Sequence, residues 1–176
     1  MKLTKGYIQV YTGNGKGKTT AAIGQAVRAA GAGLKSFIIQ FMKEYPYSEI
    51  ISLKELGKWI TVEQYGKDDF VYKAKMPGNA DLETAKKALK RAEEIMLNEE
   101  YDILILDEII VAIHFKLIKI DEVLNLISRK PGKLELILTG RYCPKAILDK
   151  ADLVTEMKEI KHYYTKNVLS RKGIES

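Results

Sequence analysis

The sequence predicts an α/β fold with a doubly wound, mostly parallel sheet and helices on both of its faces. Three observations predict it. Short apolar segments typical of strands alternate with longer segments typical of helices along the whole chain. Residues 103–106 are all aliphatic, as expected for a central strand covered on both faces. A glycine-rich stretch, residues 12–20, separates the first strand from the first helix. The length of 176 residues fits one domain over residues 1–176.

The first half of the chain predicts three strands and two helices before the long central helix. Residues 7–11 are β-branched and aromatic and form the first strand. Residues 19–30 are rich in alanine and are followed by glycines that end a helix. Residues 37–40 predict the next buried strand. A short helix near residues 48–56 and a weaker strand at residues 60–63 follow.

The second half continues the alternation. Residues 81–99 carry apolar side chains at three- and four-residue steps, which predicts a two-faced helix capped by Asn79 or Asp81. After the strand at residues 103–106, the remaining predicted elements are a helix at residues 121–128, a strand at residues 134–138 and a shorter strand at residues 152–156. Such alternation implies right-handed crossovers between parallel strands.

Composition excludes several classes of protein. With 46% hydrophobic and 30% charged residues, the chain is ordinary globular material. Its single cysteine, Cys143, rules out an internal disulfide, and no zinc-type Cys/His spacing occurs. No apolar run is long enough to span a bilayer, and too few residues precede Gly13 for a signal peptide. We therefore expect a cytoplasmic protein that does not associate with membranes.

The net charge of +6 favours anionic ligands. The densest basic stretch, residues 158–172, is interpreted as a solvated tail, and a nucleic-acid contact is the alternative.

The glycine-rich stretch predicts a phosphate-binding loop. Its residues are Thr12, Gly13, Asn14, Gly15, Lys16, Gly17, Lys18, Thr19 and Thr20. Glycines let the backbone N–H groups turn inward, and the start of the helix adds its positive dipole end. Lys18 can then lie along the phosphates, while the Thr19 hydroxyl can bind Mg²⁺. The pattern is that of Walker A except that Thr12 stands in place of the first glycine. A dinucleotide fingerprint would require glycine where Lys18 stands.

Polar residues also follow the predicted strands. Asp107 and Glu108 end an apolar strand, where a carboxylate can reach the metal, and alternation along a strand predicts that only one of them does so. Gln40 and Lys43 follow the second strand, and residues 139–141 follow the fifth. Ligands of open parallel sheets bind at this edge, so these residues should line one crevice. Arg141 is either a phosphate ligand or a surface arginine in a turn.

These features imply a nucleotide with a metal ion and leave the reaction open. A motor ATPase, a small kinase with Glu108 as its base and a transferase all fit. Phe70 and Tyr72 lie in an irregular segment and either pack or form a platform for a flat second substrate.

The loop and its flanks, residues 10–22, resemble the opening of the P-loop type of ATP:corrinoid adenosyltransferases. Further matches follow in order over nearly the whole chain, at residues 40–43, 106–108, 129–132, 138–141, 151–156, 161–162 and 171–175. The resemblance implies a P-loop NTPase-like (RecA-like) fold. It also implies transfer of the 5′-deoxyadenosyl group of ATP to the Co(I) of a reduced corrinoid, as in cobalamin biosynthesis, with release of triphosphate.

The resemblance further implies the roles of particular residues. Lys18 grips the leaving group, Mg²⁺ (or Mn²⁺) lies at Thr19 and Glu108, and the corrinoid is cobalamin, cobinamide or cobyrinic acid diamide. In the family, a Phe and a Trp two residues apart exclude the lower axial ligand of cobalt. Phe70 matches the Phe, and Tyr72 stands at the Trp position.

The resemblance also implies a homodimer and a reduced flavoprotein as electron donor, with no nucleic-acid partner. If a lid covers the site, the basic segment at residues 158–172 is a candidate for it. A small P-loop kinase or ATPase acting at the γ-phosphate is the alternative function, and a nucleic-acid-associated ATPase is a third.

Overall fold

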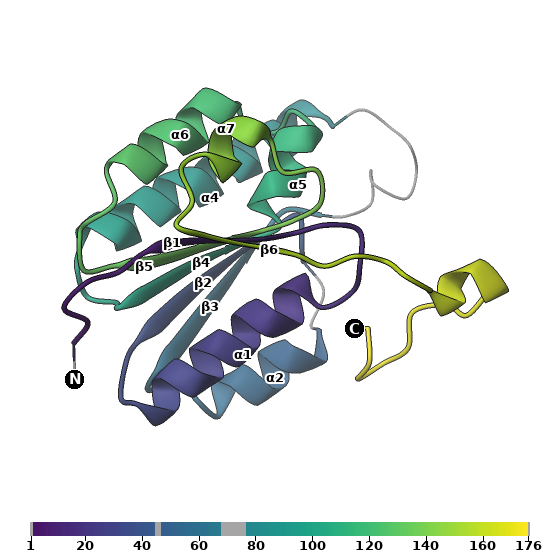
Figure 1. Cartoon of the computed structure of the whole chain (residues 1–176), viewed down its shortest axis with the longest axis horizontal. Coiled ribbons are helices and arrows are strands. Elements are labelled where there is room, and N and C mark those ends of the chain that lie inside the picture. Colours follow the sequence, from purple (N-terminus) through teal and green to yellow (C-terminus); the bar gives the residue numbers. More distant parts are fainter. Residues whose placement is uncertain (1, 45–46, 68–76, 176) are drawn as a thin grey trace.

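The computed structural model describes residues 2–44, 47–67 and 77–175. Its strands form one six-stranded sheet in the order β3-β2-β4-β5-β1-β6, and all five neighbouring pairs are parallel (Figure 1). The strands are β1 (Ile8–Thr12), β2 (Ser36–Phe41), β3 (Ile60–Tyr65), β4 (Ile103–Asp107), β5 (Glu135–Thr139) and β6 (Leu153–Glu156). The predicted doubly wound parallel sheet is confirmed.

Helices cover both faces of this sheet. They are α1 (Lys18–Gly31), α2 (Ser48–Lys54), α4 (Asn79–Leu97), α5 (Ile109–His114), α6 (Ile120–Ser128) and α7 (Lys145–Leu148), and a 3₁₀ helix spans Tyr163–Lys166. Figure 1 shows α1 and α2 on one face and the other α-helices on the opposite face. No helix within the described ranges is both long enough and apolar enough to cross a bilayer.

The sheet has a hydrophobic core on each side. On β4, Leu104 and Leu106 belong to the core beneath α4, α5 and α6, whereas Ile103 and Ile105 belong to the core beneath α1. All four side chains are buried. Each contributes about 1.5–3 kcal/mol to folding through the apolar surface it removes from water. The continuous apolar run in the sequence is thus explained by burial on both faces.

Two local details differ from the sequence predictions. α4 begins at Asn79 and is capped by Gly78, so Asn79 is not the cap; Asp81 instead accepts a hydrogen bond of 2.8 Å from the Gly78 N–H. The short helices α5 and α7 were not predicted. α5 follows β4 without an intervening turn signal, and its apolar residues resemble a continuation of the strand.

Candidate nucleotide-binding site

The glycine loop connects β1 to the start of α1. Gly13 and Gly17 have φ values of 97° and 115°, in the left-handed region that favours glycine. Gly17 is the N-cap of α1, and no side chain accepts a hydrogen bond from the first turn of that helix. The N–H groups there are therefore available to an anion, which the helix dipole also attracts.

Lys18 lies inside the loop. Its side chain is buried, and Nζ donates a hydrogen bond of 2.7 Å to the carbonyl of Gly15. Burial lowers the pKa of Lys18, against the opposing charge of Glu108. A polyphosphate bound in the loop would restore a counter-charge to this ammonium group. The position fits the predicted phosphate contact.

Asp107, at the end of β4, connects three strands and the loop. Its Oδ1 accepts hydrogen bonds from the hydroxyls of Thr19, at 2.8 Å, and Thr139, at 2.7 Å. Its Oδ2 accepts from Gln40 at 3.1 Å and from Lys43 Nζ at 2.9 Å. The side chain is 1% exposed. Polar residues from the carboxyl ends of these strands therefore meet as a hydrogen-bonded cluster.

The electrostatics of Asp107 follow from these contacts. Burial alone would raise the pKa of Asp107, but the Lys43 ammonium and the two threonine hydroxyls lower it below its usual value. Burial likewise opposes the charge of Lys43, yet Asp107 raises the pKa of that lysine. The two groups form a charged pair in the site.

The backbone of Glu108 does not have the extended conformation of a strand. Its φ of 64° is left-handed, and its N–H donates a hydrogen bond of 2.9 Å to the Thr139 hydroxyl, so it serves as the N-cap of α5. Burial and Asp107 raise the pKa of Glu108, while Lys43, Lys18 and Arg141 act in the opposite direction. Because Glu108 is no longer in the strand, strict alternation does not hold, and both carboxylates act on Lys18.

The other predicted residues fall into three groups. Arg141, at the carboxyl end of β5, is exposed, and its charge acts on both Lys18 and Glu108. Asn14 and Lys16 of the loop and Thr20 in the first turn of α1 are exposed. Phe70 and Tyr72 lie outside the described residues.

One residue that the sequence reasoning missed also joins the cluster. Gln64 Nε2 on β3 donates a hydrogen bond of 2.9 Å to Gln40 Oε1. The two glutamines are in register on neighbouring strands. The signal was present in the sequence, since Gln40 ends one predicted strand and Gln64 directly follows the next.

Oxygen ligands at the loop suit a hard cation. The Thr19 hydroxyl and the two carboxylates supply oxygen donors, which Mg²⁺ prefers. Among residues 2–44, 47–67 and 77–175, no three His, Cys, Asp or Glu side chains converge as a metal site. A cation at Thr19 would complete its shell with phosphate oxygens and water, as Mg²⁺ in nucleotide sites does.

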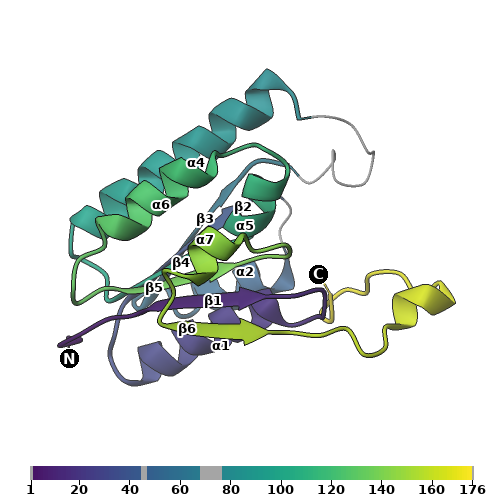
Figure 2. The same ribbon diagram turned by 45° about the horizontal axis from the view of Figure 1, so that its top comes forward.

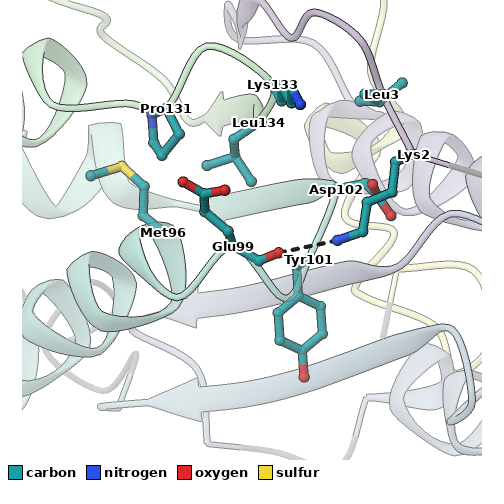
Figure 3. Close-up of a pocket in the computed structure, with 9 residues that line it drawn as sticks. All are labelled: Lys2, Leu3, Met96, Glu99, Tyr101, Asp102, Pro131, Lys133 and Leu134. Carbon is teal, nitrogen blue, oxygen red and sulfur yellow. Dashed lines mark hydrogen bonds between the residues drawn. The ribbon is translucent and has the colours of Figure 1, made fainter.

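The opposite edge of the sheet has a different character. A small cavity of about 50 Å³ lies there. Figure 3 shows residues that line it, among them Asp102 and Leu134, which directly precede β4 and β5. A volume of this size holds no nucleotide. The carboxyl edge, with its loop and charged cluster, is thus the candidate site.

Comparisons with known proteins show the family to which the chain is similar. The family model described as "ATP:corrinoid adenosyltransferase BtuR/CobO/CobP" matches residues 4–176. The corrinoid adenosyltransferase CobA of Salmonella typhimurium is 33% identical over 172 residues, which are 97% of this chain and 86% of the relative. The corrinoid adenosyltransferase of Escherichia coli K12 is 33% identical over 174 residues with the same coverage. That of Pseudomonas aeruginosa is 28% identical over 181 residues, covering 97% of this chain and 84% of the relative.

Proposed function

The chain belongs to the family of ATP:corrinoid adenosyltransferases, and we propose that its glycine loop holds the triphosphate of ATP as the leaving group of the reaction. The enzyme transfers the 5′-deoxyadenosyl group of ATP to the Co(I) of a reduced corrinoid. One observation carries the assignment of the loop: Lys18 is buried within it, and the neighbouring Thr19 is hydrogen-bonded to Asp107 at the sheet edge.

The chemistry requires positioning more than proton transfer. The electron pair of Co(I) attacks the 5′ carbon of the ribose, the cobalt–carbon bond forms, and the bond from that carbon to the triphosphate oxygen breaks. The electrons of the broken bond stay on the triphosphate, so no proton has to move. What the protein can supply is alignment and stabilisation of the developing negative charge. We propose that Lys18 and Arg141 are the cations that stabilise this charge.

We further propose that Mg²⁺, or Mn²⁺ in its place, binds at Thr19 with Glu108 as a carboxylate ligand. Such an ion would neutralise charge on the departing triphosphate. The Thr19 hydroxyl already contacts Asp107, so Asp107 would orient this hydroxyl or bind the ion through water. The hydrogen bond from the Glu108 N–H to Thr139 holds the Glu108 backbone beside this cluster.

Phe70 and Tyr72 are proposed to exclude the lower axial ligand of the corrinoid cobalt. This proposal rests on the match of Phe70 to the family pattern. An apolar, water-free face favours four-coordinate cobalt, which is easier to reduce. The phenol of Tyr72 is less apolar than an indole, because it can retain a hydrogen-bonded water.

We also propose a homodimer and an external electron donor such as a reduced flavoprotein. Exposed apolar side chains support a protein interface: Leu153 and Val154 on the edge strand β6, together with Ile160 and Leu169, are 45%, 46%, 89% and 71% exposed. A reaction that begins from Co(II) needs one electron that neither substrate supplies. The lone cysteine is compatible with a reducing compartment, and we place the enzyme in the cytoplasm.

The decisive experiment is product analysis under anaerobic conditions. With Mg-ATP and chemically reduced cobalamin, the enzyme should form a light-sensitive cobalt–carbon bond and release one triphosphate per turnover. Lys18→Ala should abolish ATP binding measured by calorimetry, whereas Lys145→Ala, on the exposed surface of α7, should bind ATP normally. ADP as the product would favour the kinase or ATPase alternative, and hydrolysis stimulated by DNA or RNA would favour the nucleic-acid-associated class.

A further inference from the structure

Residues 157–175, here called the returning segment, fold back against the outside of the glycine loop. Figure 2 shows this segment continuing from β6 past the end of β1. The N–H of Gly15 donates a hydrogen bond of 2.6 Å to the carbonyl of Met157. A Cβ atom at Gly13 would lie 2.5 Å from that carbonyl oxygen, and one at Gly15 would lie 2.7 Å from it. The glycines therefore serve this contact as well as the phosphate cradle.

Lys16 provides a second connection between the loop and the returning segment. It stands between Gly15 and Gly17, yet its side chain does not follow Lys18 into the cradle. Its Nζ donates a hydrogen bond of 2.7 Å to the carbonyl of Ile174 and lies 2.9 Å from Glu175 Oε1. The two side chains of this ion pair are 41% and 17% exposed.

Glu175 joins Tyr163 and Arg171 of the returning segment to Lys16 of the loop. Besides Lys16, its Oε1 accepts a hydrogen bond from the hydroxyl of Tyr163. Its Oε2 accepts from the backbone N–H of Arg171 at 3.0 Å and from the Arg171 guanidinium at 3.3 Å. The Arg171 guanidinium also lies over the Tyr163 ring, 4.9 Å from its centroid. One carboxylate thus fixes the place where Lys16 is held.

The contacts of Lys16 with Ile174 and Glu175, here called the anchor, matter because Lys16 is charged. A glycine-rich loop is flexible, and an ammonium group on it would be drawn toward a bound triphosphate. The anchor offers Lys16 a carboxylate and a carbonyl outside the cradle instead. Keeping the loop in one conformation before ATP arrives removes an ordering cost from binding.

We propose that Glu175 is a positioning residue for adenosyl transfer: it holds Lys16 outside the glycine loop and so keeps the loop in the shape that receives the triphosphate. Glu175 itself does not touch ATP. This inference rests on the proposed binding of triphosphate in the loop. It predicts an effect on ATP affinity with little effect on the chemical step.

The test compares Glu175→Gln, Lys16→Met and the double variant. Each single variant should raise the KM and calorimetric Kd for ATP about five- to tenfold, with kcat at saturating ATP within about twofold of the native value. The double variant should be no weaker than the singles, because both remove the same interaction. Glu156→Gln is the matched control, since Glu156 pairs only loosely with Lys158, at 3.9 Å, on the exposed surface.

Three outcomes would overturn the proposal. Unchanged ATP affinity in Glu175→Gln would show that the anchor does not shape the loop. Tighter binding of ATP in Glu175→Gln would show that Glu175 competes with the triphosphate for Lys16. Weaker binding in Glu175→Gln but not in Lys16→Met would assign the effect to the returning segment alone. Lys18→Ala is measured in parallel: if it too binds ATP normally, the proposed function of the loop fails rather than the anchor.

Discussion

Asp107 is the residue whose charge the described site depends on most directly. Its two oxygens accept four hydrogen bonds, from Thr19, Thr139, Gln40 and Lys43. Asp107→Asn keeps the shape of the side chain but leaves the buried Lys43 ammonium without its charged partner. We expect a loss of about 3–5 kcal/mol in the free energy of unfolding, measured by urea denaturation, together with a weaker metal dependence.

The same substitution gives a prediction for pH. The pKa of Asp107 is lowered in the folded protein, so its stabilising effect is complete above the usual aspartate pKa of about 4. That effect is lost as the pH falls through the lowered value. In Asp107→Asn, the free energy of unfolding should therefore fall less than in the native protein when the pH is lowered below about 4. The control is Asp102→Asn, because Asp102 is a buried aspartate at the opposite edge of the sheet. This substitution should leave ATP affinity unchanged.

Glu108 provides a separate prediction about the metal. Glu108→Gln retains the side-chain length and removes the carboxylate charge. The Mg²⁺ concentration that gives half-maximal adenosylation should rise about tenfold or more if Glu108 is a ligand. The carboxylate of Glu122 accepts a hydrogen bond at the start of α6, and Glu122→Gln should not change the Mg²⁺ titration. An unaltered titration in Glu108→Gln would assign the carboxylate a structural role only.

Phe70 and Tyr72 yield a prediction from sequence alone. Phe70→Ala should slow adenosylation that starts from Co(II) about tenfold more than adenosylation of pre-reduced Co(I), because only the first requires loss of the lower ligand. Tyr72→Trp, which restores the family residue, should accelerate the reaction from Co(II). Equal effects on both starting states would contradict the ligand-excluding role.

At the scale of single elements, the turn into α1 and the body of α1 respond differently to the same change. Gly24→Ala, within α1 and with nothing within 4 Å of the added Cβ, should stabilise the protein by about 0.5–1 kcal/mol. Gly13→Ala should destabilise it and weaken ATP binding, because its φ is 97° and the added Cβ meets Met157 at 2.5 Å. Thermal denaturation measures the stability of each variant, and calorimetry measures its ATP affinity. Equal effects of the two substitutions would contradict a strained loop.

The elements also show what the sequence reveals. The strands were predictable because buried strands are continuous runs of β-branched and aliphatic residues, as in β4. α5 was missed because its start depends on Glu108, whose left-handed φ has no local sequence signal. The same backbone conformation takes Glu108 out of the strand, so strand alternation does not decide which of the two carboxylates reaches a metal.

At the scale of the whole molecule, parallel topology made much of the site predictable. Since all strands run the same way, the polar residues at the carboxyl ends of β2, β4 and β5 had to meet at one edge, and Gln40, Asp107 and Thr139 do. The anchor between Lys16 and Glu175 was not predictable, because 159 positions separate the two residues and an ion pair of this kind has no periodicity.

The molecule as a whole should respond to the leaving group without the nucleoside. Inorganic triphosphate at about 100 times its Kd should stabilise the fold by about 2.7 kcal/mol, or about 5–10 °C in Tm. Adenosine at the same concentration should shift Tm far less, and Lys18→Ala should lose the triphosphate effect. Stabilisation by adenosine but not by triphosphate would mean that the loop does not grip the departing group.

The place of β1 in the sheet has a consequence for biosynthesis. β1 is synthesised before the other five strands of this sheet, yet its two neighbours, β5 and β6, are the last two of the six in sequence order. Until residues 135–156 have been translated, both edges of β1 are unpaired and open to other chains. The nascent polypeptide thus carries its nucleotide loop on an unprotected strand while residues 13–134 are made, and chaperones that shield exposed strand edges suit such an intermediate.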